Sequence, residues 1–328
     1  MRRMLWLVSL LGTMTTAHAA PPPAAWTQPA RYKFEYRADF SGVSVATGKR
    51  LRLWLPFPAA TADQQVLSAE IDAPWPYRRT SDALGNQFVY LEGDGVPAGA
   101  VTMRVVVERR PSPGVRLADV KRDTPADPSR YLQPQQLVPL DGVIRDLAVQ
   151  QSKGLTSDHD KARAFYDYVV KNMRYNKDGA GWGRGDAIWA CTNKRGNCTD
   201  FHSLFIGMAR SQGVPARFFI GFPIPSDGDS GTIGGYHCWA EYYDAQRGWV
   251  PLDASEANKS GQPDSYFGTL PNDRIQFSGG RDLVLTPPQQ SAPLNYFIYP
   301  YAEVDGAPVS GIATTFHFER LAAGGAGS

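Results

Sequence analysis

Apolar and polar residues alternate in several short stretches of the first third of the chain. Between residues 31 and 40, aromatic and small apolar side chains fill every second position and charged side chains fill most of the others. The same period of two recurs over residues 50–55, 88–91 and 101–108, with turn residues such as Asp94-Gly95 between the stretches. This period is typical of strands that bury one face, and several short strands in succession indicate an antiparallel β-sandwich. We therefore predict an N-terminal β-sandwich domain within residues 21–112.

The period changes in the middle of the chain, where apolar residues recur every three or four positions. This spacing predicts helices over residues 141–151 and from Ser157 to about Met173, the second capped by the Ser157 hydroxyl with Asp160 as its reciprocal partner. A third helix begins at Cys198 and ends near Gly213. Residues 178–197 are rich in glycine and predict a loop. Later apolar stretches predict strands over residues 216–222, 236–243, 249–253, 282–285, 296–302 and 314–320.

The first twenty residues have the pattern of a secretory signal peptide. Two arginines precede a short apolar run over residues 4–14, and Ala17-His18-Ala19 has the small-x-small form of a cleavage site. The prediction is export to a bacterial periplasm or the exterior. The remaining chain is divided into the sandwich domain, a proline-rich connector over residues 113–140, a catalytic domain with a C-terminal β extension over 141–321, and a disordered tail over 322–328.

Charge excludes some classes of partner. The chain carries 34 Lys and Arg against 32 Asp and Glu, and cleavage after residue 20 removes two arginines, which leaves 32 of each. Because no block of like charge is present, we expect no electrostatic binding of nucleic acid or anionic lipid. No apolar run after the signal peptide is long enough to span a bilayer, so we expect no membrane insertion of the mature chain.

The chemistry centres on Cys198. A thiol at a helix N-terminus lies beside unsatisfied N–H groups and the positive end of the helix dipole, which favour the thiolate. A nucleophilic thiol needs a base and a group that orients the base. His237 begins one predicted strand and Asp253 ends the next, so a tight turn between the strands would bring the two side chains together.

These stretches resemble a known family. Four segments, Gly196-Asn-Cys198 opening a helix, Gly213-Val-Pro-Ala-Arg217, His237-Cys-Trp-Ala-Glu241 and Trp249-Val-Pro-Leu-Asp253, are together similar to the core of the transglutaminase-like superfamily, over roughly residues 157–257. The resemblance implies an α+β, papain-like core, with Cys198 as nucleophile, His237 as base and Asp253 as the orienting acid. The large animal members depend on calcium, but this sequence has no EF-hand pattern, and we expect no cofactor.

The implied reaction is acyl transfer through a thioester. The Cys198 backbone N–H is the first candidate oxyanion donor, and Trp189 or Tyr175 is the candidate for the second. We expect a peptide or amide substrate, such as a cell-envelope protein or a peptidoglycan peptide. Hydrolysis is favoured over transamidation because water is far more concentrated in a periplasm than any amine.

Several alternatives remain open at this stage. The protein could be a protein-glutamine transamidase, or a non-catalytic binding scaffold. Three cysteines allow one bridge, Cys191 to Cys238, with Cys198 free, or three reduced thiols. The cysteines together with His202 and His237 could supply zinc ligands, but the chain has no Cys-x-x-Cys or His-Glu-x-x-His motif. We therefore expect no metal.

Overall fold

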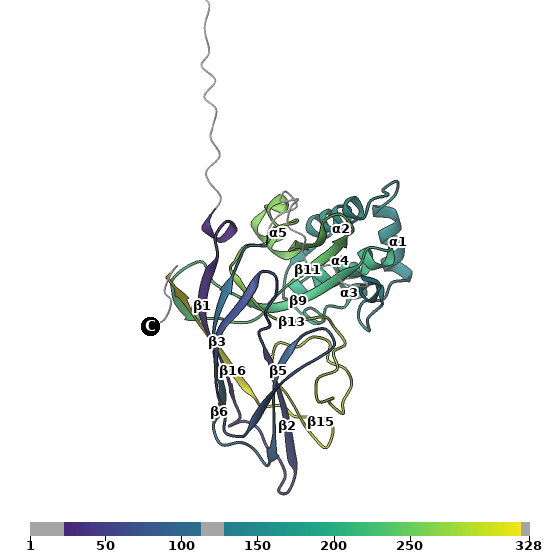
Figure 1. Cartoon of the computed structure of the whole chain (residues 1–328). Helices are drawn as coiled ribbons and strands as arrows, with labels where there is room; N and C mark the ends of the chain where they lie inside the picture. The colour runs from purple at the N-terminus through teal and green to yellow at the C-terminus, as the bar shows by residue number, and fades with distance from the viewer. Residues whose placement is uncertain (1–22, 113–127, 323–328) are drawn as a thin grey trace, which may run out of the picture.

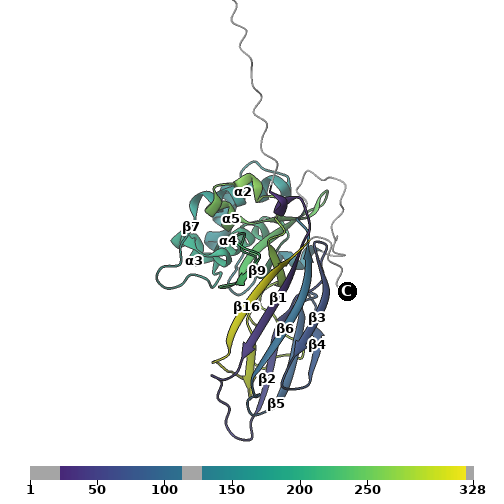
Figure 2. The ribbon, with the colours of Figure 1, turned by 90° about the vertical axis from the view of Figure 1, so that its left-hand side faces the viewer.

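The computed structural model describes residues 23–112 and 128–322. They form an α+β fold in which a β-sandwich carries a mixed helix-and-sheet core at one end (Figures 1 and 2). Of the predictions for the chain ends and the connector, the signal peptide lies outside the described residues, as do most of the connector and most of the tail. No helix within the described ranges is long and apolar enough to cross a membrane.

The sandwich consists of two antiparallel five-stranded sheets. The first has the order β10 (Ser230–Thr232), β16 (Ala313–Leu321), β1 (Ala30–Asp39), β6 (Ala100–Arg109) and β3 (Gln64–Asp72). The second has the order β15 (Ala307–Pro308), β14 (Tyr301–Val304), β2 (Arg50–Phe57), β5 (Gln87–Asp94) and β4 (Tyr77–Ser81). The alternation along β1 buries every second side chain, from Tyr32 to Ala38, as the sequence predicts.

The end of the chain returns to the sandwich, which changes the domain boundaries. The sequence assigns residues 141–321 to the catalytic domain, but β14, β15 and β16 complete the two sandwich sheets. Strand β16 pairs with β1 along its whole length, with Phe34 opposite Phe318. Each strand's own pattern reveals its buried face but not its partner, and these partners are more than 250 residues apart. The core is therefore an insertion between sandwich strands.

The core has a four-stranded antiparallel sheet with helices on one side. The sheet order is β12 (Gly248–Leu252), β11 (His237–Asp244), β9 (Ala216–Pro223) and β13 (Arg274–Gly279). The helices are α1 (Gly142–Gln151), α2 (Asp158–Asn172), α3 (Ala187–Asn193), α4 (Cys198–Ser211) and α5 (Ala254–Ser260). Helix α4 lies at the centre, buried from Cys198 to Arg210 by α1, α2, α3 and the sheet. Three short 3-10 helices complete the list, η1 (Ala24–Trp26), η2 (Pro128–Leu132) and η3 (Pro263–Ser265).

Most predicted core elements are present at their predicted positions. The Ser157 hydroxyl caps α2 by accepting from the Asp160 N–H, and it donates to the Asp160 carboxylate. Three predictions are wrong in whole or in part. Residues 178–197 contain α3, residues 282–285 form no strand, and of the strand predicted over 296–302 only residues 301 and 302 belong to one, β14. Strands β3 and β4 were missed because they face solvent over most of their length and so lack a clear apolar alternation.

Aromatic side chains join the sandwich to the core. Phe34 and Tyr36 of β1 pack against Phe222 of β9 and Phe277 of β13, with ring centroids 5.1–6.1 Å apart. All four side chains are buried and belong to one continuous apolar cluster. Because aromatic side chains bury large areas and dominate core energetics, we infer that the sandwich fixes the position of β9, a neighbour of β11, and of β13, which pairs with β9 on its other side.

Candidate functional site

The nucleophile candidate lies in a tightly built helix start. Asn197 is the N-cap of α4 and its side chain accepts from the Thr199 N–H, while the Asp200 carboxylate accepts from the Asn197 N–H, so that the two form a capping box. Gly196 precedes the cap with φ 145°, and a Cβ there would collide with the Asp200 carboxylate. Cys198 is the first residue of α4, and its N–H is therefore one of those without an intrahelical acceptor.

The same carboxylate organises the loop in front of the helix. Asp200 also accepts from the backbone N–H groups of Gly183 and Gly185, at 2.7 and 3.0 Å. Burial raises the pKa of Asp200, although these backbone donors oppose the shift. The loop is braced from its other side by Tyr296, whose hydroxyl donates to the Gly183 carbonyl, and by Asn295, which donates to the Arg184 carbonyl. Thus Asn295 and Tyr296, in the segment that leads back to the sandwich, hold in place the loop that precedes the Cys198 helix.

His237 and Asp253 meet across the β11–β12 hairpin. His237 is the first residue of β11, opposite Gly221 of β9, and its Nε2 lies 2.6 Å from Asp253 Oδ2. Asp253 follows β12 and is the N-cap of α5, with Oδ1 accepting from the Ser255 hydroxyl and the Glu256 N–H, both at 2.9 Å. Cys198 lies close enough to the imidazole that each group shifts the pKa of the other, the thiol downward and the imidazole upward. The structure therefore brings Cys198, His237 and Asp253 together in that order.

A buried arginine that the sequence did not predict completes the environment of the carboxylate. Arg274 of β13 donates from Nη1 to Asp253 Oδ2 at 2.8 Å, and both side chains are at most 3% exposed. Asp253 therefore accepts four hydrogen bonds, two of them from cationic partners. No pattern around Arg274 announces this role, because β13 reaches the site only through its pairing with β9.

The charges of the three groups support one another. Burial opposes the imidazolium of His237, but the Asp253 carboxylate and the Cys198 thiolate outweigh it and raise the pKa of His237 to about 10. Burial also raises the pKa of the Cys198 thiol, but hydrogen bonds to Cys238 and His237 and the His237 charge place that pKa well below its ordinary value. For Asp253, burial is outweighed by His237 and Arg274, and the pKa lies well below its usual range. The directions of the three pKa shifts all favour a thiolate–imidazolium pair beside an ionised carboxylate.

Residues 145–254 match the model of the transglutaminase-like superfamily. This part of the chain belongs to that superfamily. An uncharacterised protein of Haemophilus influenzae is 27% identical over 355 residues, covering 94% of this chain and 96% of its own length. YebA of Bacillus subtilis is 28% identical over 145 residues, which cover 39% of this chain and 19% of YebA. A candidate cysteine protease from Cytophaga hutchinsonii has a similar fold, with a TM-score of 0.60 at 17% identity over 90% of this chain and 93% of that chain.

Within this transglutaminase-like core, the two aromatic oxyanion candidates lie in different surroundings. Tyr175 pairs with Gly196 in the short parallel ladder of β7 (Arg174–Tyr175) and β8 (Arg195–Gly196). Burial raises the pKa of Tyr175, and the negative charge of the Cys198 thiolate raises it further. Trp189 packs its ring against Gly181, where a Cβ would collide with it. Of the two, Tyr175 is the one that lies in the ladder next to Cys198, opposite Gly196.

The other predicted cysteine and metal groups do not assemble as a bridge or a zinc site. All three cysteines are free, so the Cys191–Cys238 bridge is wrong for this structure. Cys191 on α3 contacts the Lys194 amine at 3.8 Å, whereas Cys238 lies 3.8 Å from His202 on α4. Among the described residues, the one cluster with metal-like spacing is His237, Asp253 and Glu256. Because Arg274 already donates to Asp253, a metal cation does not fit there.

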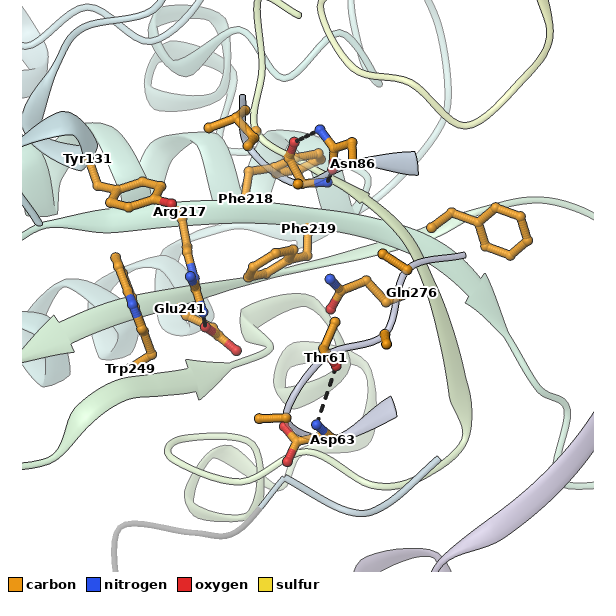
Figure 3. Close-up of a pocket in the computed structure, with 18 of the residues that line it drawn as sticks. Thr61, Asp63, Asn86, Tyr131, Arg217, Phe218, Phe219, Glu241, Trp249 and Gln276 are labelled. Atoms are coloured by element: carbon orange, nitrogen blue, oxygen red, sulfur yellow. Dashed lines mark hydrogen bonds and ion pairs between the residues drawn. The ribbon is translucent and has the colours of Figure 1, made fainter. Parts of the chain in front are cut away.

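A separate cavity of about 220 Å³ lies on the face of the sheet away from α4, between it and the sandwich loops (Figure 3). Two of its charged groups pair with each other, since Arg217 donates twice to Glu241 and stacks 4.0 Å from the Trp249 ring. Asn86 is likewise occupied by the backbone of Gly279. These interactions are all within the protein, and none of them points to a particular ligand for the cavity.

Proposed function

We propose that this protein is a cysteine-dependent acyl-transfer enzyme that hydrolyses an amide or peptide bond. The observation that carries the proposal is the buried pair of His237 and Asp253, with Nε2 of His237 2.6 Å from Asp253 Oδ2, beside Cys198 at the start of α4, whose thiol has a pKa that His237 lowers. A base held by a carboxylate beside a thiol of lowered pKa is the arrangement that activates a cysteine nucleophile.

In the proposed mechanism the Cys198 thiolate attacks the substrate carbonyl carbon. The carbonyl oxygen becomes an oxyanion, which the Cys198 N–H stabilises, with the Tyr175 hydroxyl as the second donor. The His237 imidazolium gives its proton to the departing amine, and a thioester remains. Neutral His237 then takes a proton from water, whose oxygen attacks the thioester, and the carboxylic acid leaves as the thiolate re-forms. Asp253 holds the imidazole ring in one orientation throughout.

The proposed setting is the bacterial envelope. It is supported by the signal-peptide pattern of residues 1–20. A peptide or amide of the envelope is accordingly the proposed substrate. In this setting water is the abundant acceptor for the thioester, which favours hydrolysis over transfer to an amine.

The first test is the rate of iodoacetamide labelling across pH, with labelled sites mapped to separate Cys198 from Cys191 and Cys238. In the wild type we expect fast labelling of Cys198 well below about pH 8.5, where an ordinary thiol ionises. In His237→Ala we expect the labelling midpoint to return towards that value. Slow labelling of Cys198 that is indifferent to His237 would favour a non-catalytic scaffold.

A second measurement separates hydrolysis from transamidation. Wild type and Cys198→Ser are incubated with a library of peptide amides and an excess of a labelled primary amine. Release of free acid that requires Cys198 supports hydrolysis. Covalent incorporation of the amine as the main product would replace the hydrolase by a transamidase while leaving the same nucleophile in place.

A further inference from the structure

Two helix starts carry the proposed chemistry, and one buried side chain joins them. Cys198 is the first residue of α4, and Asp253 is the N-cap of α5. His202, one turn after Cys198, has no exposed surface and contacts both helix starts. Its Nδ1 lies 2.7 Å from the Cys198 carbonyl oxygen, and its Nε2 lies 3.1 Å from the Ala254 nitrogen.

These contacts define the protonation state of the ring. The Ala254 backbone can only donate, so Nε2 of His202 is the acceptor and carries no proton. Since a neutral imidazole has one N–H, the proton is on Nδ1, which donates to the Cys198 carbonyl. Burial lowers the pKa of His202, in agreement with a neutral ring. The groups that face it are Asp253, 3.6 Å from Nε2, Cys238, 3.8 Å from Nδ1, and the charges of Cys198 and His237.

We propose that His202, as a neutral Nδ1–H imidazole, is a positioning residue that fixes the nucleophile-bearing turn of α4 relative to the acid-bearing start of α5. The role rests on the proposed function of Cys198. The Ala254 N–H is the first of α5 and has no acceptor within its own helix, so the imidazole both satisfies it and links it to the residue that bears the thiol. His202 does not reach the substrate. It acts through the distance between Cys198 and the His237–Asp253 pair.

The alternative is an ordinary core histidine whose contacts serve stability alone. The two roles differ in what a change at His202 does to Cys198. If the residue positions the nucleophile, its loss lowers kcat and shifts the pH midpoint of Cys198 labelling while KM changes little. Small misplacements of a reacting group cost about 10- to 100-fold in rate. If the residue is only structural, stability falls but the labelling midpoint and kcat stay.

Two substitutions separate the two hydrogen bonds. His202→Asn places an amide N–H near the position of Nδ1 and keeps the bond to the Cys198 carbonyl. His202→Gln places an amide oxygen near the position of Nε2 and keeps the bond to Ala254. We expect each to reduce kcat about tenfold or more, and His202→Ala, which loses both bonds, to reduce it further.

The matched control is His159 on α2, a partly buried histidine whose Nδ1 bonds the Tyr242 hydroxyl at 2.6 Å away from the proposed site. His159→Asn should lower the urea unfolding midpoint without moving the labelling midpoint of Cys198. The proposal is overturned if the His202 variants behave like His159→Asn, losing stability but keeping both kcat and the labelling midpoint.

A measurement on the wild-type protein keeps the proposal testable if the variants fail to fold. Long-range ¹H–¹⁵N spectra of ¹⁵N-histidine-labelled protein report which ring nitrogen bears the proton. We expect His202 to show a proton on Nδ1 and an unprotonated Nε2 from pH 6 to 8. A proton on Nε2, or a charged ring, would overturn the proposal. This readout needs no substrate, whereas an inert Cys198 in the labelling assay would refute the proposed function instead.

Discussion

The buried pair of Arg274 and Asp253 provides a sharp test of how the site is held together. In Arg274→Met an unbranched apolar side chain of similar length replaces the guanidinium. Asp253 loses the 2.8 Å bond at Oδ2, but it keeps His237 at the same oxygen and Ser255 and the Glu256 N–H at the other. Three of its four hydrogen bonds therefore remain, and one of them comes from a cation.

The magnitude follows from what the carboxylate retains. Removing one partner of a buried ion pair typically costs about 3–5 kcal/mol, because a charge is left uncompensated, and a hydrogen bond to a charged group contributes about 1.5–3 kcal/mol. Since the His237 imidazolium still balances Asp253, we expect a loss of about 2–3 kcal/mol in the free energy of unfolding at pH 7. The corresponding fall in Tm is about 3–5 °C, because the unfolding entropy of a chain of this size is about 0.6 kcal/mol per kelvin.

The pH dependence gives the reasoning a second check. The lowered pKa of Asp253 contributes stability above its unfolded value near 3.9, and that contribution is lost as the pH falls through the folded pKa. Without Arg274 the folded pKa is less depressed, so the contribution is smaller and acid unfolding begins at a higher pH. The assay is urea unfolding followed by circular dichroism, repeated from pH 3 to 8.

The control is Arg163→Met, which removes an arginine that is 36% exposed and pairs with Asp167 and Asp264. Exposed pairs contribute below about 1 kcal/mol, so we expect little change. If Arg274→Met is no less stable than this control, the buried pair contributes nothing net and the argument fails. A loss of Cys198 labelling at pH 6 in Arg274→Met would also contradict it, because His237, not Arg274, holds the thiolate.

Three further outcomes are expected. The raised pKa of His237 contributes stability that is fully present below about pH 6.5 and is lost as the pH rises through about 10. Because His237 also loses the proton that it gives to the departing amine, kcat/KM should fall near pH 10. A fall near pH 7 would instead show that Asp253 and Cys198 do not raise the pKa of this imidazole. Gly221→Ala should lower stability by about 3 kcal/mol, because the added Cβ meets the Ile275 carbonyl across the ladder, whereas Gly234→Ala meets nothing within 4 Å and should be silent in the same unfolding assay. A chain ending at residue 300 lacks β14 to β16 and should be insoluble or unfolded by circular dichroism, whereas one ending at residue 322 should fold; a folded, labelled core in the shorter chain would refute the need for the returning strands.

Local patterns in the sequence predict many helices and strands of the core, but they do not predict how these elements pair across long separations in the chain. The spacing around Cys198 predicts α4, and the residues at its start predict the position of the thiol. The hairpin argument brings His237 to Asp253 because both ends lie within sixteen residues. Arg274 and the returning strands could not be predicted, since each depends on strand pairing across long separations. His202 appeared in the sequence only as a metal ligand candidate, because its role depends on Ala254, fifty-two residues away.

The position of β16 has a consequence for the order in which the protein forms. Strand β1 is made first and needs β16 on one side, yet nearly three hundred residues emerge between them. Until the last strand arrives, β1 presents a long unpaired edge of the kind that invites pairing with other chains, and closing so large a loop slows folding. The thiol site is braced by Asn295 and Tyr296, which emerge only shortly before β16. The contacts that hold the loop beside Cys198 can therefore form only when synthesis of the chain is nearly complete. We expect the thiol to be less reactive in incomplete chains for that reason.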